Sequence, residues 1–288
     1  MNVARSPDEL AERDRAVAIG TFDGVHAGHR RVLEAALAAG TAPTVVTFDP
    51  HPRAILGPPT PLITTVERRL ELIAELGIDE ALVLRFDDEL AALEPEEFVD
   101  AVLRPIGTRV VVAGENFRFG CRRGGDLELL ARLGLDVRPV PLVPGISSER
   151  IRELVRAHEL EAAAELLGRP FEVEGLVVTG DKRGHELGFA TANLDVAADQ
   201  LLPPYGIYAG SALGHRAAVS IGVNPHYGQG VQKVEAYLLD FDGDLYGQRL
   251  VVELWKHLRE ERAFSGEAEL VEAIAADVEA TRRAVRPG

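Results

Sequence analysis

The sequence predicts two consecutive domains: an α/β domain with a parallel sheet, and then a small closed β-barrel followed by a helix. Over residues 1–168, short apolar runs alternate with segments of helical periodicity, which is typical of chains that build parallel sheets. Over residues 169–288, short β-type runs follow one another, separated by Gly, Asn and Asp. Between the two patterns stand Gly168 and Pro170, which are typical of a helix end.

Five apolar runs of the first domain are predicted to be strands, and helical segments separate them. The predicted strands are 17–19, 44–48, 81–84, 109–113 and 136–140. After the first strand and a short polar turn, a helical pattern runs to Ala39, and the other predicted helices are 65–75, 94–103, 126–133 and 147–167. Polar loops follow three of these strands, at 21–29, 49–53 and 114–123. Because the carboxyl ends of parallel strands meet at one edge of a sheet, we expect the three loops to form one ligand site.

The second domain shows evenly spaced short strands, which favour a small closed barrel. The predicted strands are 171–178, 207–212, 216–221, 234–241 and 250–254, and the predicted closing helix is 265–285. Asp242 and Gly243 form a dipeptide that favours a hairpin turn. The Thr-Ala-Asn sequence at 191–193 has the composition of a turn. We expect the closing helix, which is amphipathic, to pack on the barrel.

Composition and charge exclude several classes of protein. The 288 residues are 46% hydrophobic and 27% charged, and they contain no apolar run near the ~20 residues that a membrane span needs. A net charge of −15 argues against general binding to nucleic acids or anionic membranes. Cys121 is the one cysteine, which excludes an internal disulfide and a cysteine-built metal site. Residues 1–15 lack the apolar core of a signal peptide, so we expect a cytoplasmic protein.

The segment 17–31 has the features of a phosphate-binding turn between a strand and a helix. His26 and His29 are three residues apart, so they project from one face of the first helical turn. Gly24 and Gly28 allow the backbone to approach a ligand closely. The free N–H groups of a helix N-terminus favour anions, and the two imidazoles add to them. The usual glycine-rich nucleotide loops are absent from the sequence, so a nucleotide site here uses other means.

Four motifs then resemble those of the flavin-adenylylating module of bacterial FAD synthetases, which are bifunctional riboflavin kinase/FMN adenylyltransferases. The motifs are GTFDGVHAGH at 20–29, TFDPHPR at 47–53, GENFRFG at 114–120 and ISSERIR at 146–152. The resemblance implies a nucleotidyltransferase fold in which the phosphate of FMN attacks the α-phosphate of ATP. It implies catalytic roles for His26 and His29. It also implies ATP or phosphate binding by Gly20, Phe22, Asp23, Gly24, Ser148 and Arg152, and flavin binding by Phe48, Pro50, His51, Asn116 and Arg118.

Two further stretches resemble the riboflavin kinase module. Residues 180–193 resemble its glycine-rich flap and the metal-binding motif after it, and residues 234–241 resemble the strand that carries its catalytic glutamate. The resemblance implies that Glu235 takes a proton from the ribityl hydroxyl as it attacks the γ-phosphate. Thr191 and Asn193 are then the ligands of Mg²⁺. The flap residues implied to hold the ATP phosphates are Gly180, Lys182, Arg183 and Gly184.

Three residues depart from the family pattern: Glu149 stands where Thr is usual, His185 where Arg is usual, and Ala190 where Pro is usual. Two alternatives therefore stay open. One is a diverged paralogue that acts on a modified flavin or another phosphorylated substrate. The other is a flavin-binding protein that has lost one or both activities. For the function that the resemblance implies, we expect small-molecule partners (riboflavin, FMN and ATP, with FAD as product), neither nucleic acid nor membrane, and a monomer or weak homo-oligomer.

Overall fold

The structure is a computed structural model that describes residues 1–179, 191–223 and 232–288. The predicted flap residues Gly180, Lys182, Arg183 and Gly184, and the departures His185 and Ala190, lie outside the described residues. The chain divides into two compact units, Met1–Ser147 and Ser148–Gly288. The helical segment before Gly168, which the sequence assigns to the first domain, thus belongs by its contacts to the second unit.

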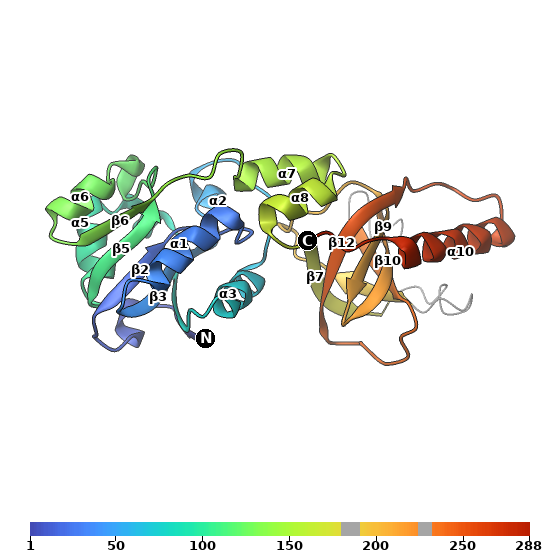
Figure 1. Ribbon diagram of the computed structural model, residues 1–288, viewed down its shortest axis with the longest axis horizontal. Helices are drawn as coiled ribbons and strands as arrows, with labels where there is room; N and C mark the ends of the chain where they lie inside the picture. Colours follow the sequence, from blue (N-terminus) through green and yellow to red (C-terminus); the bar gives the residue numbers. More distant parts are fainter. Residues whose placement is uncertain (180–190, 224–231) are drawn as a thin grey trace. The chain divides into compact units, whose positions relative to one another are not determined.

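The first unit is built on a six-stranded parallel sheet with the strand order β1-β4-β3-β2-β5-β6. Figure 1 labels β3, β2, β5 and β6 side by side. The strands are β1 (Asn2–Ala4), β2 (Arg15–Ile19), β3 (Ala42–Asp49), β4 (Glu80–Arg85), β5 (Thr108–Gly114) and β6 (Asp136–Val140). All five predicted strands are present. β1 was missed because three residues are too few to show a period, and only its pairing with β4 makes it a strand.

Helices cover both faces of this sheet. They are α1 (Ala27–Leu37), α2 (Arg53–Leu56), α3 (Val66–Glu75), α4 (Asp88–Ala92), α5 (Pro95–Phe98) and α6 (Leu127–Arg132), with a π-helix at Val99–Leu103 and 3-10 turns at Pro7–Glu9 and Cys121–Arg123. Side chains of β2 alternate between the two cores: Ala16 and Ala18 pack with α1 and α3, whereas Val17 and Ile19 pack with the helices of the opposite face. This period of two is what a sheet buried on both faces requires.

The sheet order confirms the predicted placement of the polar loops. β3, β2 and β5 are neighbours and run parallel, so the loops that follow them leave from the same edge. At the opposite edge, the start of β2 carries a buried ion pair. Arg15 Nε donates to Glu80 Oε1 at 2.6 Å, and Glu80 also accepts from Thr44 Oγ1 at 2.9 Å and from Arg13 Nη2 at 3.0 Å. The pair joins the amino ends of the central strands.

Replacing Glu80 with glutamine is expected to destabilise the first unit by roughly 3–5 kcal/mol, because it leaves the buried charge of Arg15 uncompensated. Burial raises the pKa of Glu80, but hydrogen bonds from Arg15, Thr44 and Arg13 and the charge of Arg15 outweigh it, so the pKa is lowered. The pair therefore stabilises the fold above the unfolded-state pKa of about 4.3, and the stabilisation is lost as the pH falls through the folded-state pKa. Urea unfolding of the wild type and of Glu80→Gln from pH 7 to pH 3 measures this.

The matched control for this test is Asp14→Asn, which breaks an ion pair of the same kind with Arg109 on the exposed surface. An exposed pair contributes little, so this variant should unfold like the wild type. If Glu80→Gln also unfolded like the wild type at pH 7, the pair would not stabilise the sheet.

The second unit is a closed antiparallel barrel with the strand order β10-β11-β8-β7-β12-β9. Its elements are α7 (Ser148–Arg156), α8 (Leu160–Leu167), β7 (Phe171–Val178), β8 (Thr191–Asp195), β9 (Gly206–Ala212), β10 (His215–Val223), β11 (Gln232–Leu238), β12 (Arg249–Arg259) and α10 (Glu267–Arg283). α10 packs on the barrel as expected. Arg216 Nη1 on β10 donates to the carbonyl oxygens of Thr281 and Ala284, at 2.9 Å and 2.6 Å.

Three local expectations for this unit were wrong. The helix 147–167 is broken into α7 and α8, because His158 takes a left-handed backbone conformation with φ of +60°. Residues 191–193 belong to strand β8, because pairing with β11 overrides their turn composition. Asp242 and Gly243 do not close a hairpin, because β11 pairs with β10 and β8 whereas β12 pairs with β7 and β9.

Candidate active sites

The loop after β2 turns sharply and is tied to the segment before α3. Phe22, Gly24 and Val25 all have positive φ, at +50°, +86° and +40°. Asp23 is buried, and its Oδ1 accepts from the backbone N–H groups of Ile63 and Thr64 at 2.9 Å and 3.2 Å. A Cβ on Gly24 would come within 3.0 Å of Ile63, so this glycine serves close packing within the protein. One carboxylate oxygen of Asp23 therefore anchors the loop. This structural role is additional to the ATP binding that is predicted for Asp23.

The two predicted catalytic histidines lie together at the start of α1. The rings of His26 and His29 stack with centroids 3.6 Å apart, and Phe22 meets the His29 ring edge-on at 5.4 Å. His26 is the N-cap of α1, and its Nδ1 accepts from the backbone N–H of His29 at 3.2 Å. A neutral His26 ring consequently carries its proton on Nε2. Gly28 leaves room for the His26 ring, since a Cβ there would come within 3.1 Å of it.

The electrostatic setting keeps His29 neutral. Burial lowers the pKa of His29 well below its usual value near 6.5, and the nearby charges of His26 and Arg69 lower it further. His29 Nδ1 is buried without a hydrogen-bond partner among the described residues. A neutral imidazole still offers one N–H donor, so the pair can bind phosphate oxygens by hydrogen bonds at neutral pH.

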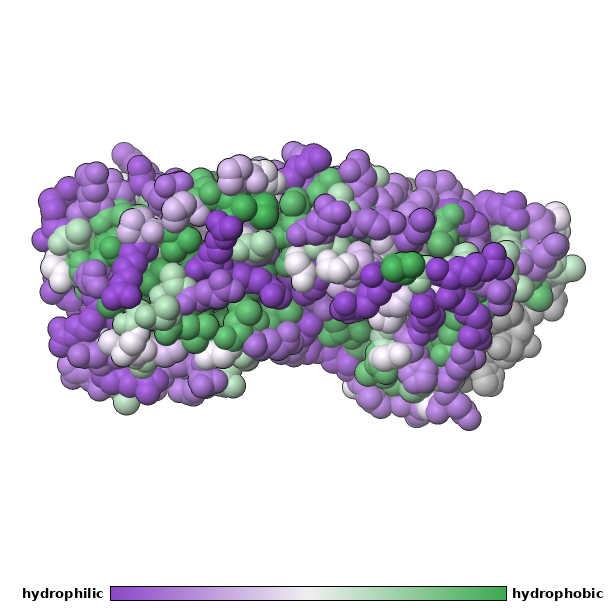
Figure 2. All heavy atoms as spheres, in the orientation of Figure 1, coloured by the Kyte–Doolittle hydropathy of each residue, from purple (hydrophilic) through white to green (hydrophobic). Residues whose placement is uncertain are grey.

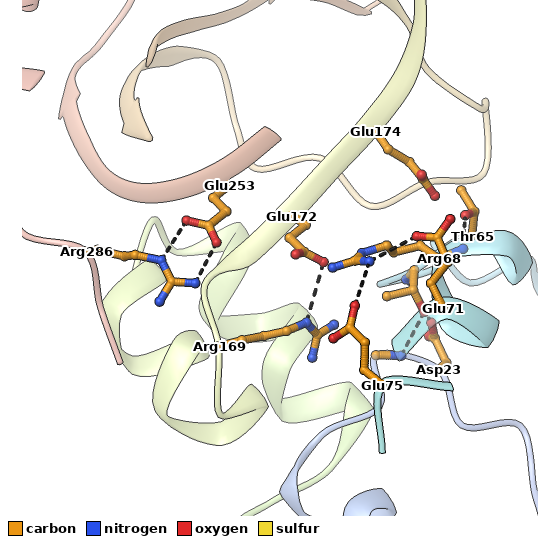
Figure 3. Close-up of polar contacts among 12 residues, drawn as sticks. Asp23, Thr65, Arg68, Glu71, Glu75, Arg169, Glu172, Glu174, Glu253 and Arg286 are labelled. Carbon is orange, nitrogen blue, oxygen red and sulfur yellow. Dashed lines mark hydrogen bonds and ion pairs between the residues drawn. The ribbon is translucent and has the colours of Figure 1, made fainter. Parts of the chain in front are cut away.

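Arg69 of α3 is a residue of this region that the sequence reasoning missed. Its side chain is buried, and Nη1 donates to Phe48 O at 3.3 Å and to Thr47 Oγ1 at 3.4 Å. Burial lowers its pKa, while the charges of Asp23 and Asp49 oppose that effect. Its neighbour Arg68 instead pairs along α3 with Glu71 and Glu75 at 3.0 Å and 3.4 Å (Figure 3). The helical pattern of the sequence does not show which of the two adjacent arginines is buried. Only the packing of α3 on the sheet buries Arg69.

The predicted flavin-binding residues lie at the end of β3 and in the loops after β3 and β5. Phe48 is at the end of β3, and its ring meets Phe86 edge-on at 5.6 Å. Pro50 is exposed, and His51 Nδ1 accepts from the N–H of Arg53 at 3.2 Å. After β5, Asn116 and Arg118 are exposed, and Asn116 Oδ1 lies against Gly114, where a Cβ would come within 3.3 Å of it. These groups share the sheet edge at which the histidine loop leaves β2.

Ser148 and Arg152 lie on α7 in the second unit. Ser148 begins the helix, and Arg152 is buried. The carboxylate of Glu149 contacts Arg152 at 3.3 Å and Arg156 at 3.8 Å. Glu149, which stands where the family usually has Thr, thus places a carboxylate next to Arg152, the residue that the resemblance assigns to the phosphates. Pairing with two arginines compensates that negative charge.

The barrel brings the predicted kinase residues together across two strands. Asn193 on β8 is directly opposite Glu235 on β11, and Thr191 is opposite Tyr237. Opposed residues share a face of the sheet, and their neighbours Ala192, Val234 and Ala236 are buried on the other face. Lys233 Nζ contacts Glu235 Oε1 at 2.9 Å. Two residues predicted as metal ligands and the predicted base therefore form one cluster on the face of the barrel opposite its core.

Asn193 Oδ1 fits the predicted magnesium site. It is buried and has no hydrogen-bond partner among the residues that the structure describes. Burying an oxygen without a hydrogen-bond donor costs folding free energy, and a bound hard cation would compensate for the missing donor. Thr191, two residues away on the same face, offers a second hard oxygen.

Fold and site together define a class of protein: a nucleotidyltransferase-like α/β unit joined to a riboflavin-kinase-like barrel. Within the described residues, every helix is too short or too polar to cross a bilayer. Figure 2 shows hydrophilic side chains over much of the face in view.

Comparison with known proteins gives the family. Residues 8–152 match the family model described as FAD synthetase, and residues 167–285 match the one described as riboflavin kinase. The chain is 34% identical to the bifunctional riboflavin kinase/FMN adenylyltransferase of Listeria monocytogenes, over 96% of this chain and 94% of that protein. It is 36% identical to that of Pseudomonas fluorescens, over 93% and 92%. This chain therefore belongs to the family of bifunctional riboflavin kinase/FMN adenylyltransferases.

A solved structure is also similar over the whole chain. A crystal structure described as a macrolide-efflux protein from Streptococcus pneumoniae has a TM-score of 0.86 and 28% identity, covering 98% of this chain and 99% of that one. The two chains thus share their fold across both units.

Proposed function

We propose that this chain converts riboflavin to FAD in two steps, with the barrel unit phosphorylating riboflavin and the α/β unit adenylylating the FMN. The chain carries the two activities of its family, riboflavin kinase and FMN adenylyltransferase. One observation supports the assignment of residues: in each family segment the side chains that we propose to react are neighbours, His26 with His29 in the first and Asn193 with Glu235 in the second. The boundary between the two functional modules is proposed at residues 168/169.

In the adenylylation step, a phosphate oxygen of FMN attacks the α-phosphorus of ATP, and the bond to the leaving pyrophosphate breaks. His26 and His29 donate hydrogen bonds to the phosphate oxygens as charge develops there. The buried guanidinium of Arg69 on α3 adds positive charge near the loops that carry Asp23 and Asp49. We assign ATP binding to Gly20, Phe22, Asp23 and Gly24, with Ser148 and Arg152 at the β- and γ-phosphates, and flavin binding to Phe48, Pro50, His51, Asn116 and Arg118.

In the kinase step, Glu235 accepts the proton of the ribityl hydroxyl. The oxygen of that hydroxyl attacks the γ-phosphorus of ATP, and ADP leaves. The contact with Lys233 orients the Glu235 carboxylate. Thr191 and Asn193 would hold Mg²⁺, which would neutralise charge on the phosphates. We assign the remaining phosphate contacts to Gly180, Lys182, Arg183 and Gly184.

A time course with riboflavin, ATP and Mg²⁺ tests this function, with riboflavin, FMN and FAD separated by chromatography. We expect riboflavin to fall, FMN to rise and then decline, and FAD to accumulate. Supplying FMN in place of riboflavin should yield FAD alone. Poor turnover of both flavins would favour the diverged paralogue, and tight flavin binding without ATP turnover would favour the binding protein.

Replacing Asn193 with alanine is expected to raise the Mg²⁺ concentration for half-maximal FMN formation by roughly tenfold or more, since it removes an oxygen ligand. Asn193→Asp keeps an oxygen at the same position and should restore a low magnesium requirement. FMN formation measured over a magnesium titration gives the result. An unchanged requirement in Asn193→Ala would remove Asn193 from the metal site.

The setting of this function is also a proposal. We propose that the protein works in the cytoplasm, as a monomer or weak homo-oligomer, on small molecules alone. Its single cysteine, Cys121, is free, as is usual in a reducing compartment. Its net charge of −15 disfavours nucleic-acid partners.

A further inference from the structure

A second cluster of ligand-type side chains lies in the barrel unit, apart from the residues assigned above. His158 is in the connection between α7 and α8, His257 is on β12, and Glu260 follows β12 directly. Glu260 Oε1 lies 3.8 Å from Nε2 of His158 and 3.8 Å from Nε2 of His257. The two imidazole centroids are 4.0 Å apart, and the three ligand atoms all lie within 4.8 Å of one another.

Hydrogen bonding to Tyr208 fixes which nitrogen of His158 faces this cluster. The buried Tyr208 hydroxyl donates its only proton to the carbonyl oxygen of Pro204. The same oxygen lies 2.9 Å from His158 Nδ1, so Nδ1 must supply the proton of that contact. A neutral His158 therefore carries a bare lone pair on Nε2, which faces the carboxylate of Glu260.

His257 adds a third acceptor that is held in place. Its Nε2 is buried and has no hydrogen-bond partner among the described residues. The ring packs against Gly206, where a Cβ would come within 2.7 Å of Nε2. Three ligand-type atoms, one from each side chain, therefore converge at one place in the barrel unit.

The backbone at His158 is costly for the residue that occupies it. Helix α7 ends with hydrogen bonds from the N–H of His158 to Val155 O and from the N–H of Glu159 to Leu154 O. This motif normally has glycine at the position of His158, because any other side chain is disfavoured in the left-handed region. The imidazole is kept where glycine would favour folding, which indicates a role for the side chain itself.

We propose that His158, His257 and Glu260 bind one divalent transition-metal ion of the zinc type, with Tyr208 orienting His158 through its Nδ1. Two imidazole nitrogens and one carboxylate form a ligand set that Zn²⁺ prefers and Mg²⁺ does not. Bonds of about 2.0–2.1 Å in a tetrahedral site place ligand atoms roughly 3.3 Å apart, slightly closer than here. Glu260 can shorten its own two distances of 3.8 Å, because its side chain is 72% exposed.

Glu260 lines a surface hollow of about 530 Å³ together with Tyr205, Glu261, Arg262 and Ala263, so solvent reaches the carboxylate side of the cluster. A fourth ligand can therefore be water. The ion would tie the α7–α8 connection to the end of β12. This site does not depend on the proposed flavin chemistry.

Equilibrium dialysis of the full chain against Zn²⁺, with Mg²⁺ in excess, tests the site. We expect the wild type to bind one Zn²⁺. We expect His257→Ala and Glu260→Gln each to bind Zn²⁺ at least tenfold more weakly than the wild type. Tyr208→Phe should weaken the same site by about 10–100-fold, because it removes the partner of a ligand. His215→Ala is the matched control, because it removes a half-buried histidine of β10 outside the cluster and should bind like the wild type.

A thermal measurement keeps the test valid if His257→Ala folds poorly. Zn²⁺ should raise the Tm of the wild type, and this shift should be lost in Glu260→Gln, whose exposed side chain is not needed for folding. Equal zinc affinity and equal Tm shifts in the wild type and Glu260→Gln would overturn the proposal.

Discussion

His29→Ala is expected to lower FAD formation from FMN and ATP by about 10²–10³-fold, as the loss of one charge-stabilising donor typically does. The ring is neutral, stacked on His26 and held by Phe22, so its remaining N–H has one orientation in which to meet a phosphate oxygen. Formation of FMN from riboflavin should stay at the wild-type rate, because the barrel has its own reactive groups. Separate assays started from riboflavin and from FMN measure the two rates.

Arg31→Ala is the control for this variant, since Arg31 lies on the exposed side of the same helix and should leave both rates unchanged. Thermal unfolding of His29→Ala separates a lost donor from a lost fold, because His29 also packs against Phe22. A well-folded His29→Ala that makes FAD at the wild-type rate would remove His29 from the reaction.

Glu235→Gln is expected to lower FMN formation by about 10²–10⁴-fold, which is the usual contribution of a general base. Glutamine has nearly the same shape and can still oppose Asn193 on β8, so the barrel should remain intact. FAD formation from supplied FMN should be unaffected. Raising the pH should not restore the rate of Glu235→Gln, since the amide has no accessible basic form.

Asp242→Asn controls for the loss of a negative charge near β11, because Asp242 is exposed in the loop that follows this strand. It should phosphorylate riboflavin like the wild type. A Glu235→Gln variant with the wild-type rate of FMN formation would show that the hydroxyl needs no base at this position. Phosphoryl transfer would then depend on positioning and on charge neutralisation alone.

The sequence by itself determined the architecture of both units, because the patterns that specify it are local. Apolar runs with helices between them placed β2, β3 and β5, and the polar loop after each strand placed the histidine pair beside the flavin-binding candidates. Even spacing of short strands indicated the barrel. Each of these patterns spans only a few consecutive residues. Within such a segment, the spacing of the apolar side chains indicates which face is buried.

Tertiary structure alone decided the features that join residues far apart in the chain. The burial of Arg69 but not Arg68, the pairing of Arg15 with Glu80, and the convergence of His158, His257 and Glu260 leave no local trace. Strand β8 also needed its partner β11 to override a turn-like composition. The physical reason is that burial and ion pairing depend on which surfaces meet, and that is set by the packing of whole elements.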